Sequence, residues 1–172
     1  CKGIVTIAKV FSDALGVPVR VTNDANAAAM GEMTYGAARG MKNFIMITLG
    51  TGVGSGIVCD GRVIYGSDGF AGELGHVIVD HTESARPCGC GRKGCLETYC
   101  SATGVARTAR LVLEGSTEAS LLRQLNPDEI TSFEVFQAAE QGDKLALEIF
   151  EETGRRLGAA CADFAAFSSP EA

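Results

Sequence analysis

The chain has 172 residues, 46% of them hydrophobic and 21% charged, with a net charge of −6. This composition is that of a globular protein and excludes an intrinsically disordered one. The acidic balance leaves no basic face to neutralise phosphates, so we expect this segment to bind no nucleic acid. Because we see no secretion signal and no apolar run of membrane-spanning length, we expect a cytoplasmic protein without membrane contact.

The first forty residues are predicted to form a helix, a strand and a second helix. Apolar residues recur at helical spacing over Ile4–Leu15, and the following glycine ends that helix. Val17–Val21 is typical of a short buried strand, and Ala25–Ala38 is rich in strong helix formers. Asn23 and Asp24 therefore stand where a strand gives way to a helix, where α/β folds place ligands. Asp24 either performs chemistry there or caps the helix.

A glycine-rich hairpin is predicted in the next segment. Phe44–Leu49 has the pattern of a strand, Gly50–Gly54 that of a turn, and Ser55–Cys59 that of a returning strand. Asp60-Gly61 is a strong hairpin signal, and Arg62–Tyr65 is predicted to be a third strand.

The turn of this hairpin is a candidate phosphate loop. Backbone N–H groups of Gly50, Thr51 and Gly52 can surround an anion, and the Thr51 hydroxyl adds a donor. The loop lacks the lysine and the following helix of a Walker motif, so an ordinary hairpin turn is the alternative.

The C-terminal part is predicted to be a helical scaffold. Ser101 caps a helix that runs to Glu114, and Ser116–Leu125 is expected to form another. A third, over Ser132–Gln141, opens with a Thr131/Glu134 capping box. A long amphipathic helix then begins after Gly142-Asp143.

Three cysteines and a histidine close together in the sequence predict a zinc site. Cys88, Cys90 and Cys95 stand in a glycine-rich segment, and His76 or His81 is available as the fourth ligand. Structural zinc takes four nitrogen or sulfur ligands in a tetrahedron. Disulfides are the alternative, but seven cysteines are an odd number and nothing indicates an oxidising compartment.

The other four cysteines are interpreted as buried bystanders. They are Cys1, Cys59, Cys100 and Cys161. Glu73 and Glu97 flank the predicted metal ligands in sequence, so a bound metal could hold two carboxylates against one ligand.

Three segments follow one another in an order that resembles the ROK family of sugar kinases and repressors. They are Thr22–Ala28, Leu49–Gly56, and Glu73–His76 together with Cys88–Glu97. The match spans about Val19 to Thr98, and the cysteine segment is its most specific part. The resemblance implies an α/β fold of the actin-like ATPase (ribonuclease H-like), hexokinase type, with a zinc-binding loop and a helical C-terminal half.

The resemblance also implies a division of the chain. Residues 1–42 correspond to the C-terminal part of the first domain, and residues 43–172 to the second domain, truncated before its adenosine motif. The family's Asp-x-Gly-Gly-Thr phosphate loop and Gly-Gly adenosine motif are not in this chain. We therefore expect a central fragment, and complete catalysis by this piece alone is not expected.

The family pattern assigns roles to the candidate residues. It places zinc on His76 with Cys88, Cys90 and Cys95. Asp24 would be the general base for phosphorylating a hexose. The sugar would be held by residues that offer donors and acceptors to its hydroxyls, namely Asn23, Asp24, Glu73, His76 and Glu97. Gly50, Thr51 and Gly52 would cradle the ATP phosphates, with Mg²⁺ bridging them.

Two functions of different classes follow. The first is an ATP-dependent, glucokinase-like sugar kinase, expected to be a homodimer. The alternative is the sugar-sensing domain of a ROK-family transcriptional repressor. A base and a phosphate cradle serve no chemical need in a pure sensor, which favours the kinase.

Overall fold

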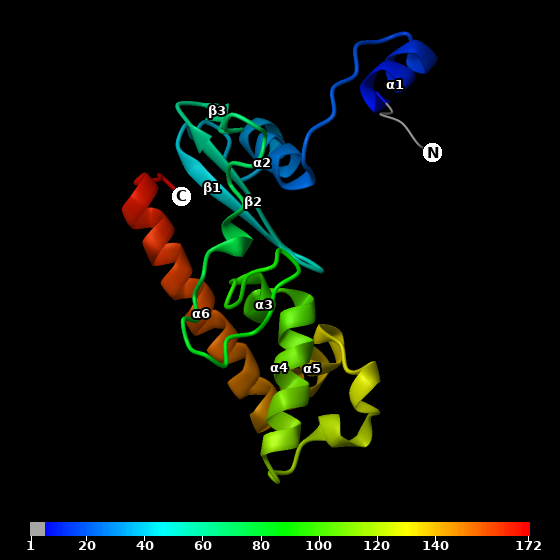
Figure 1. The fold of residues 1–172 in the computed structure, drawn as a ribbon, viewed down its shortest axis with the longest axis vertical. Helices are drawn as coiled ribbons and strands as arrows, with labels where there is room; N and C mark the ends of the chain where they lie inside the picture. Colours follow the sequence, from blue (N-terminus) through cyan, green and yellow to red (C-terminus); the bar gives the residue numbers. More distant parts are fainter. Residues whose placement is uncertain (1–5) are drawn as a thin grey trace.

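The computed structural model describes residues 6–172 (Figure 1). A three-stranded sheet carries α2 on one face, and the C-terminal helices lie toward its other face. Helix α1 stands apart from this body, joined to α2 by an extended segment. The elements, in chain order, are α1 (Ile7–Leu15), α2 (Asp24–Tyr35), β1 (Phe44–Leu49), β2 (Val53–Cys59), β3 (Arg62–Val63), η1 (Leu74–His76), α3 (Glu97–Cys100), α4 (Ala102–Gly115), η2 (Leu121–Gln124), η3 (Pro127–Glu129), α5 (Ser132–Glu140) and α6 (Lys144–Ser168).

The sheet is antiparallel, in the order β1-β2-β3. Phe44 pairs with Val58 at one end of the β1-β2 ladder, and Leu49 pairs with Val53 at the other. The predicted hairpin is thus confirmed, although β2 begins two residues earlier than expected and β3 ends at Val63. The glycine-rich turn between β1 and β2 lies at the end of the sheet that faces α3 and α4 (Figure 1).

Helix α2 packs closely on one face of the sheet. Because side chains alternate along a strand, Gly54 and Gly56 of β2 face the helix. A Cβ atom on Gly56 would lie only 2.8 Å from the Cβ of Ala29 in α2. These two glycines therefore let the helix approach the strand, and Phe44 and Val58 join Ala29 in the buried cluster between them.

The opposite face of the sheet packs on α3 and α6. Ile45 and Ile47 of β1 contact a buried cluster that includes Leu96, Tyr99 and Phe164. Leu96 is fully buried, and Tyr99 is 5% exposed. The residues that enter and form α3 are therefore held between the sheet and the long C-terminal helix.

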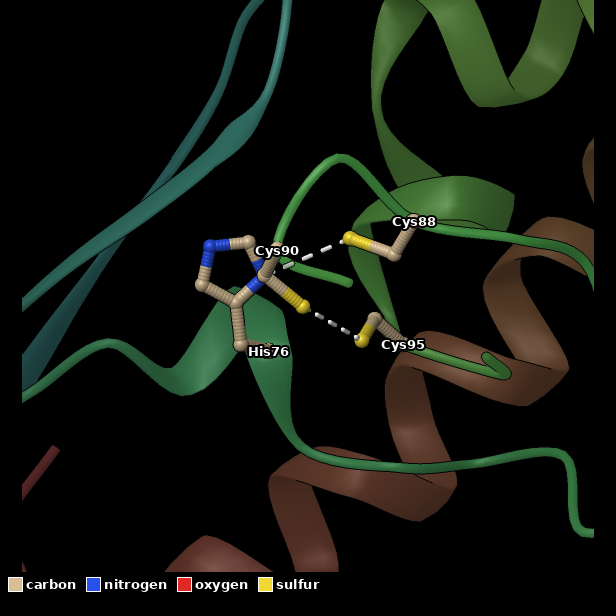
Figure 2. Close-up of side chains that lie close together, drawn as sticks. All are labelled: His76, Cys88, Cys90 and Cys95. Carbon is tan, nitrogen blue, oxygen red and sulfur yellow. Dashed lines mark hydrogen bonds between the residues drawn. The ribbon is translucent and has the colours of Figure 1, made fainter. Parts of the chain in front are cut away.

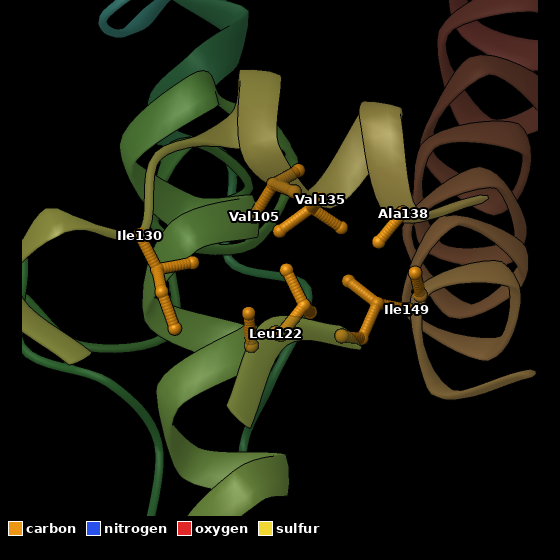
Figure 3. Packing of buried hydrophobic residues seen from close by; sticks show 8 residues of the cluster. Val105, Leu122, Ile130, Val135, Ala138 and Ile149 are labelled. Carbon is orange, nitrogen blue, oxygen red and sulfur yellow. The ribbon is translucent and has the colours of Figure 1, made fainter. Parts of the chain in front are cut away.

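A second core holds the helical half together (Figure 3). Its buried residues come from α4, η2, α5 and α6 and from the segment between η3 and α5: Val105, Ala109, Leu122, Ile130, Val135, Ala138, Ala146 and Ile149. Side-chain caps start three of these helices, and those of α4 and α5 are as predicted. Ser101 caps α4, Thr131 and Glu134 form a capping box on α5, and Asp143 caps α6.

The predicted strand over Val17–Val21 is wrong. The segment is extended but pairs with no strand among residues 6–172, and Val17 and Val21 are 53% and 64% exposed. A strand needs a neighbour to satisfy its backbone groups, and here the N–H of Val19 donates to the Ser12 hydroxyl over 2.8 Å instead.

The predicted helix over Ser116–Leu125 is also wrong, because only η2 forms there. The Arg123 guanidinium donates hydrogen bonds to the carbonyl oxygens of Leu113, Ser116 and Glu118. These carbonyl oxygens accept from a side chain instead of from the backbone of a helix. Residues 116–120 therefore form no helix before η2.

Two helix boundaries differ from expectation. Helix α2 ends at Tyr35 instead of Ala38, because the Glu32 carboxylate accepts the N–H of Ala37 and the chain turns away at Gly36. Ile4, the predicted start of α1, lies outside the described residues, and α1 begins at Ile7.

Among the described helices, none has both the length and the apolar character needed to cross a bilayer.

Candidate active site

A cavity of about 600 Å³ opens where α2, the β1-β2 turn and α3 meet. It contains two acidic side chains, Asp24 and Glu97, from segments more than seventy residues apart in sequence. The complete lining is Asp24, Ala25, Ala28, Thr48, Leu49, Gly50, Thr51, Gly52, Val53, Gly54 and Glu97. The predicted base, the predicted phosphate loop and one predicted sugar ligand thus share one cavity.

Asp24 is exposed at the first turn of α2, but the side chain that caps this helix is that of Asn23. The Asn23 Oδ1 accepts the N–H groups of Ala25 and Asn26, at 2.8 and 3.2 Å. Asp24 Oδ1 accepts the Ala25 N–H over 2.8 Å. Since Asn23 already performs the capping, the second carboxylate oxygen of Asp24 is not needed to start the helix.

The Gly50–Gly52 loop is fixed by its carbonyl groups. The Gly50 carbonyl accepts the N–H of Ala102 over 2.8 Å, and the Thr51 carbonyl accepts the hydroxyl of Thr103 over 2.9 Å. Both bonds point these carbonyls toward the start of α4. The N–H of a trans peptide points opposite to its carbonyl, so the N–H groups of Thr51 and Gly52 point away from α4.

Glu97 enters the cavity from the first turn of α3. Its Oε2 accepts the backbone N–H of Val53 over 3.0 Å, which ties α3 to the first residue of β2. The carboxylate also lies directly over Gly52, where an added Cβ atom would overlap it. The phosphate-loop candidate and this carboxylate are therefore in direct contact.

The four predicted metal ligands converge in the structure (Figure 2). The donor atoms of His76, Cys88, Cys90 and Cys95 all lie within 4.8 Å of one another. The His76 Nδ1 stands 3.6 Å from the Cys88 sulfur, and the sulfurs of Cys90 and Cys95 are also 3.6 Å apart. Ligands about 2.3 Å from a tetrahedral zinc ion are about 3.8 Å apart, so the spacing fits this metal.

The cysteines of this cluster are free thiols, and His81 is not part of the cluster. Backbone and side-chain hydrogen bonds from Arg92 lower the pKa of Cys90 to about 6. Burial, in contrast, raises the pKa of Cys95 to about 12. A thiolate at this buried position needs a bound cation, which is the chemistry that a Cys₃His donor set offers zinc.

Three other predicted sugar ligands, Asn23, Glu73 and His76, do not line this cavity. Glu73 is exposed just before η1, which packs against β2 where Gly75 meets the carbonyl of Val53. The second ring nitrogen of His76 faces away from the three sulfurs (Figure 2).

Sequence reasoning missed two residues whose polar groups contribute to the cavity. Thr48 could have been found, because strand alternation places it on the face of Gly54, whose Cβ position is 2.6 Å from the Thr48 hydroxyl. Val53 contributes a backbone N–H, which no side-chain pattern could indicate.

Among the predicted bystander cysteines, Cys100 is buried, but Cys59 is exposed because it closes β2 beside the turn. Cys161 is half-buried, and Cys1 lies outside the described residues.

Comparison with known proteins decides the relationship of this chain. The model of the ROK family matches residues 5–172. The chain belongs to the ROK family. A glucokinase of Halalkalibacterium halodurans is 46% identical over 156 residues, which cover 90% of this chain and 47% of the relative. The chain spans about half the length of the curated relatives it matches.

Solved ROK structures include both kinases and regulators. A ROK family glucokinase from Streptomyces griseus, in complex with glucose and AMPPNP, is 38% identical and superposes with a TM-score of 0.81. The similarity covers 95% of this chain and 53% of that one. A ROK family transcriptional regulator, a homologue of the Escherichia coli MLC protein, gives 36% identity and a TM-score of 0.84, over 96% of this chain and 40% of that one. This chain therefore has the ROK, hexokinase-type fold.

Proposed function

We propose that this chain forms the central part of an ATP-dependent hexose kinase of the glucokinase type. The observation that carries the proposal is the cavity in which Asp24, the Gly50–Gly52 loop and Glu97 meet. A base, a phosphate cradle and a sugar ligand are what phosphoryl transfer to a hydroxyl requires. The similarity to glucokinases supports the same function.

Asp24 acts as the general base in this proposal. Its carboxylate accepts the proton of a sugar hydroxyl while the hydroxyl oxygen attacks the γ-phosphorus of ATP and ADP leaves. The Asn23 cap supports this role, because it holds the start of α2 without the second carboxylate oxygen of Asp24.

Glu97 binds the sugar by accepting hydroxyl hydrogen bonds, together with Asn23, Glu73 and the free ring nitrogen of His76. A buried carboxylate left without its hydroxyl partner costs about 1–3 kcal/mol, so such a site rejects deoxy sugars. Of these four residues only Glu97 lines the cavity formed by residues 6–172, and the other three contact the sugar once it is bound in this proposal.

The backbone N–H groups of Thr51 and Gly52 bind the ATP phosphates. Their direction away from α4 supports this role, and Mg²⁺ would be held there by phosphate oxygens and water. One zinc ion would be held by His76, Cys88, Cys90 and Cys95. It supplies no electron or proton chemistry in this proposal and fixes the loop between η1 and α3.

A release assay for ADP with the full-length protein tests the proposal. Glucose, mannose, fructose and N-acetylglucosamine are offered in turn with ATP and Mg²⁺, and we expect ADP release with at least one of them. The alternative is that the chain is the sugar-sensing part of a transcriptional repressor, which the similarity to the ROK regulator favours. Sugar binding without ADP release would establish that alternative.

A further inference from the structure

Helix α3, which carries Glu97 into the cavity, is too short to hold its own orientation. It contains four residues, and no side chain caps its N-terminus. Isolated helical turns are unstable in water, so contacts from outside must decide how α3 is rotated. Glu97 itself contributes one such contact, through the N–H of Val53.

A second set of external contacts is made by Tyr99, on the other side of α3 from Glu97. Residues two positions apart in a helix differ by about 200° around its axis, so Tyr99 and Glu97 point in nearly opposite directions. Tyr99 is 5% exposed, and its hydroxyl donates to Asp80 Oδ2 over 2.5 Å. The Tyr99 hydroxyl oxygen in turn accepts the backbone N–H of Arg86 over 3.1 Å.

Two guanidinium groups hold the ring of Tyr99. The central carbons of the Arg86 and Arg156 guanidinium groups each lie 4.4 Å from the centre of the ring, the geometry of a cation–π contact. Arg86 also donates to the carbonyl of Thr98 over 2.9 Å and to the hydroxyl of Thr108 over 2.9 Å. Hydrogen bonds therefore hold the Tyr99 hydroxyl, and cation–π contacts hold its ring.

Asp80 and Arg86 lie between His76 and Cys88, in the segment that joins the candidate metal ligands. This segment is bonded to the residues before α3, since Val77 accepts the N–H of Leu96 and Gly94 donates to the carbonyl of Arg86. The Tyr99 side chain therefore links α3 to the segment between the metal ligands, beside the bond from Arg86 to the Thr98 carbonyl.

We propose that Tyr99 is a positioning residue, which sets the orientation of α3 through Asp80 and Arg86 and thereby holds the Glu97 carboxylate in the sugar site. This inference rests on the proposed function, because it takes Glu97 as a sugar ligand. It predicts that loss of one hydroxyl, on the far side of α3 from the cavity, weakens sugar binding by way of Glu97.

The test measures hexose binding by calorimetry in the full-length protein without ATP, using the four hexoses named above. Tyr99→Phe keeps the ring and removes the hydroxyl. We expect its dissociation constant for the bound hexose to rise about tenfold, with zinc content unchanged. Asp80→Asn, which keeps the volume and an acceptor oxygen, is expected to give a smaller rise. Tyr35→Phe is the matched control, because Tyr35 is 90% exposed and lies outside the site, and its affinity stays that of the wild type.

A double-mutant cycle separates positioning from general destabilisation. If Tyr99 acts through Glu97, adding Tyr99→Phe to Glu97→Gln weakens binding no further, whereas independent effects add. Additive losses overturn the inference, as does an unchanged affinity in Tyr99→Phe while the wild type binds. A wild-type protein that binds none of the hexoses overturns the proposed function and the inference together.

Discussion

The Glu97 carboxylate lies over Gly52, and no side-chain atom could be added to that glycine without displacing it. The same carboxylate accepts the N–H of Val53, the residue that begins β2. One acidic side chain thus contacts two consecutive residues of the turn and the strand, and joins the loop proposed for phosphate to the site proposed for sugar.

This contact predicts the effect of Gly52→Ala. The new methyl group meets the end of a flexible side chain, so Glu97 moves aside and the fold is kept. We expect sugar affinity to fall at least tenfold while the melting temperature changes little. Calorimetry with the sugar and a thermal melt measure the two effects. Gly158→Ala in α6, where an added Cβ meets nothing within 4 Å, is the control and should leave sugar binding unchanged.

The metal cluster predicts the behaviour of its cysteines. Cys95→Ser removes a buried sulfur ligand, so zinc content should fall strongly and the melting temperature should drop with it, because a structural metal contributes folding free energy. Metal analysis of the freshly purified, reduced protein is the measurement. The matched control is Cys59→Ser, which changes an exposed free thiol outside the cluster.

The same experiment distinguishes the two histidines. His76→Ala should reduce zinc binding, whereas His81→Ala should not, since His81 is absent from the cluster. A protein that contains no zinc as purified, or that loses it equally with either histidine variant, contradicts the assignment.

The Tyr99 contact also predicts a pH dependence. The Tyr99 hydroxyl, helped by the N–H and hydroxyl of Thr82, lowers the pKa of Asp80 from 3.8 to about 2. A carboxyl whose pKa is lower in the folded state adds stability above its unfolded pKa and loses it as the pH falls through the folded pKa. We expect part of the acid sensitivity of folding between about pH 4 and 2 to come from this group. Thermal melts over this range should therefore depend less on pH in Asp80→Asn than in the wild type, and identical slopes would contradict the assignment.

The local elements were predictable where a few adjacent residues determine them. The Ser101 cap and the Thr131/Glu134 capping box depend on side chains within three or four residues, and both formed as expected. The strand predicted at Val17–Val21 failed because a strand depends on a partner elsewhere in the chain, and no residue from 6 to 172 provides one.

The sequence indicated several residues that the structure brings together, but not how they are arranged. Sequence spacing indicated the three cysteines and left His76 and His81 open as the fourth ligand. The family resemblance implied His76, and the structure places His76, not His81, with the cysteines. The sequence could not indicate that Glu97 shares a cavity with Asp24 while Glu73 lies outside it. The position of Glu97 depends on how α3 packs against the rest of the chain. The contacts of Tyr99 with Asp80 and the two arginines come from three separate segments, and no local pattern signals them.

Substitutions of the neighbouring residues Asn23 and Asp24 should have different effects, the first on stability and the second on turnover. Asn23→Ala removes the side chain that accepts two N–H groups at the start of α2, so it should cost about 1 kcal/mol of stability. Asp24→Asn leaves that cap in place, so the fold should be kept. Turnover should nevertheless fall about 10² to 10⁴-fold, because an amide cannot accept the hydroxyl proton, and the loss should fall on kcat with sugar binding largely retained. Steady-state kinetics of the full-length protein, with denaturant unfolding of both variants, measure the contrast. Near-normal turnover in Asp24→Asn would reduce Asp24 to a structural residue and remove the base from the proposed mechanism.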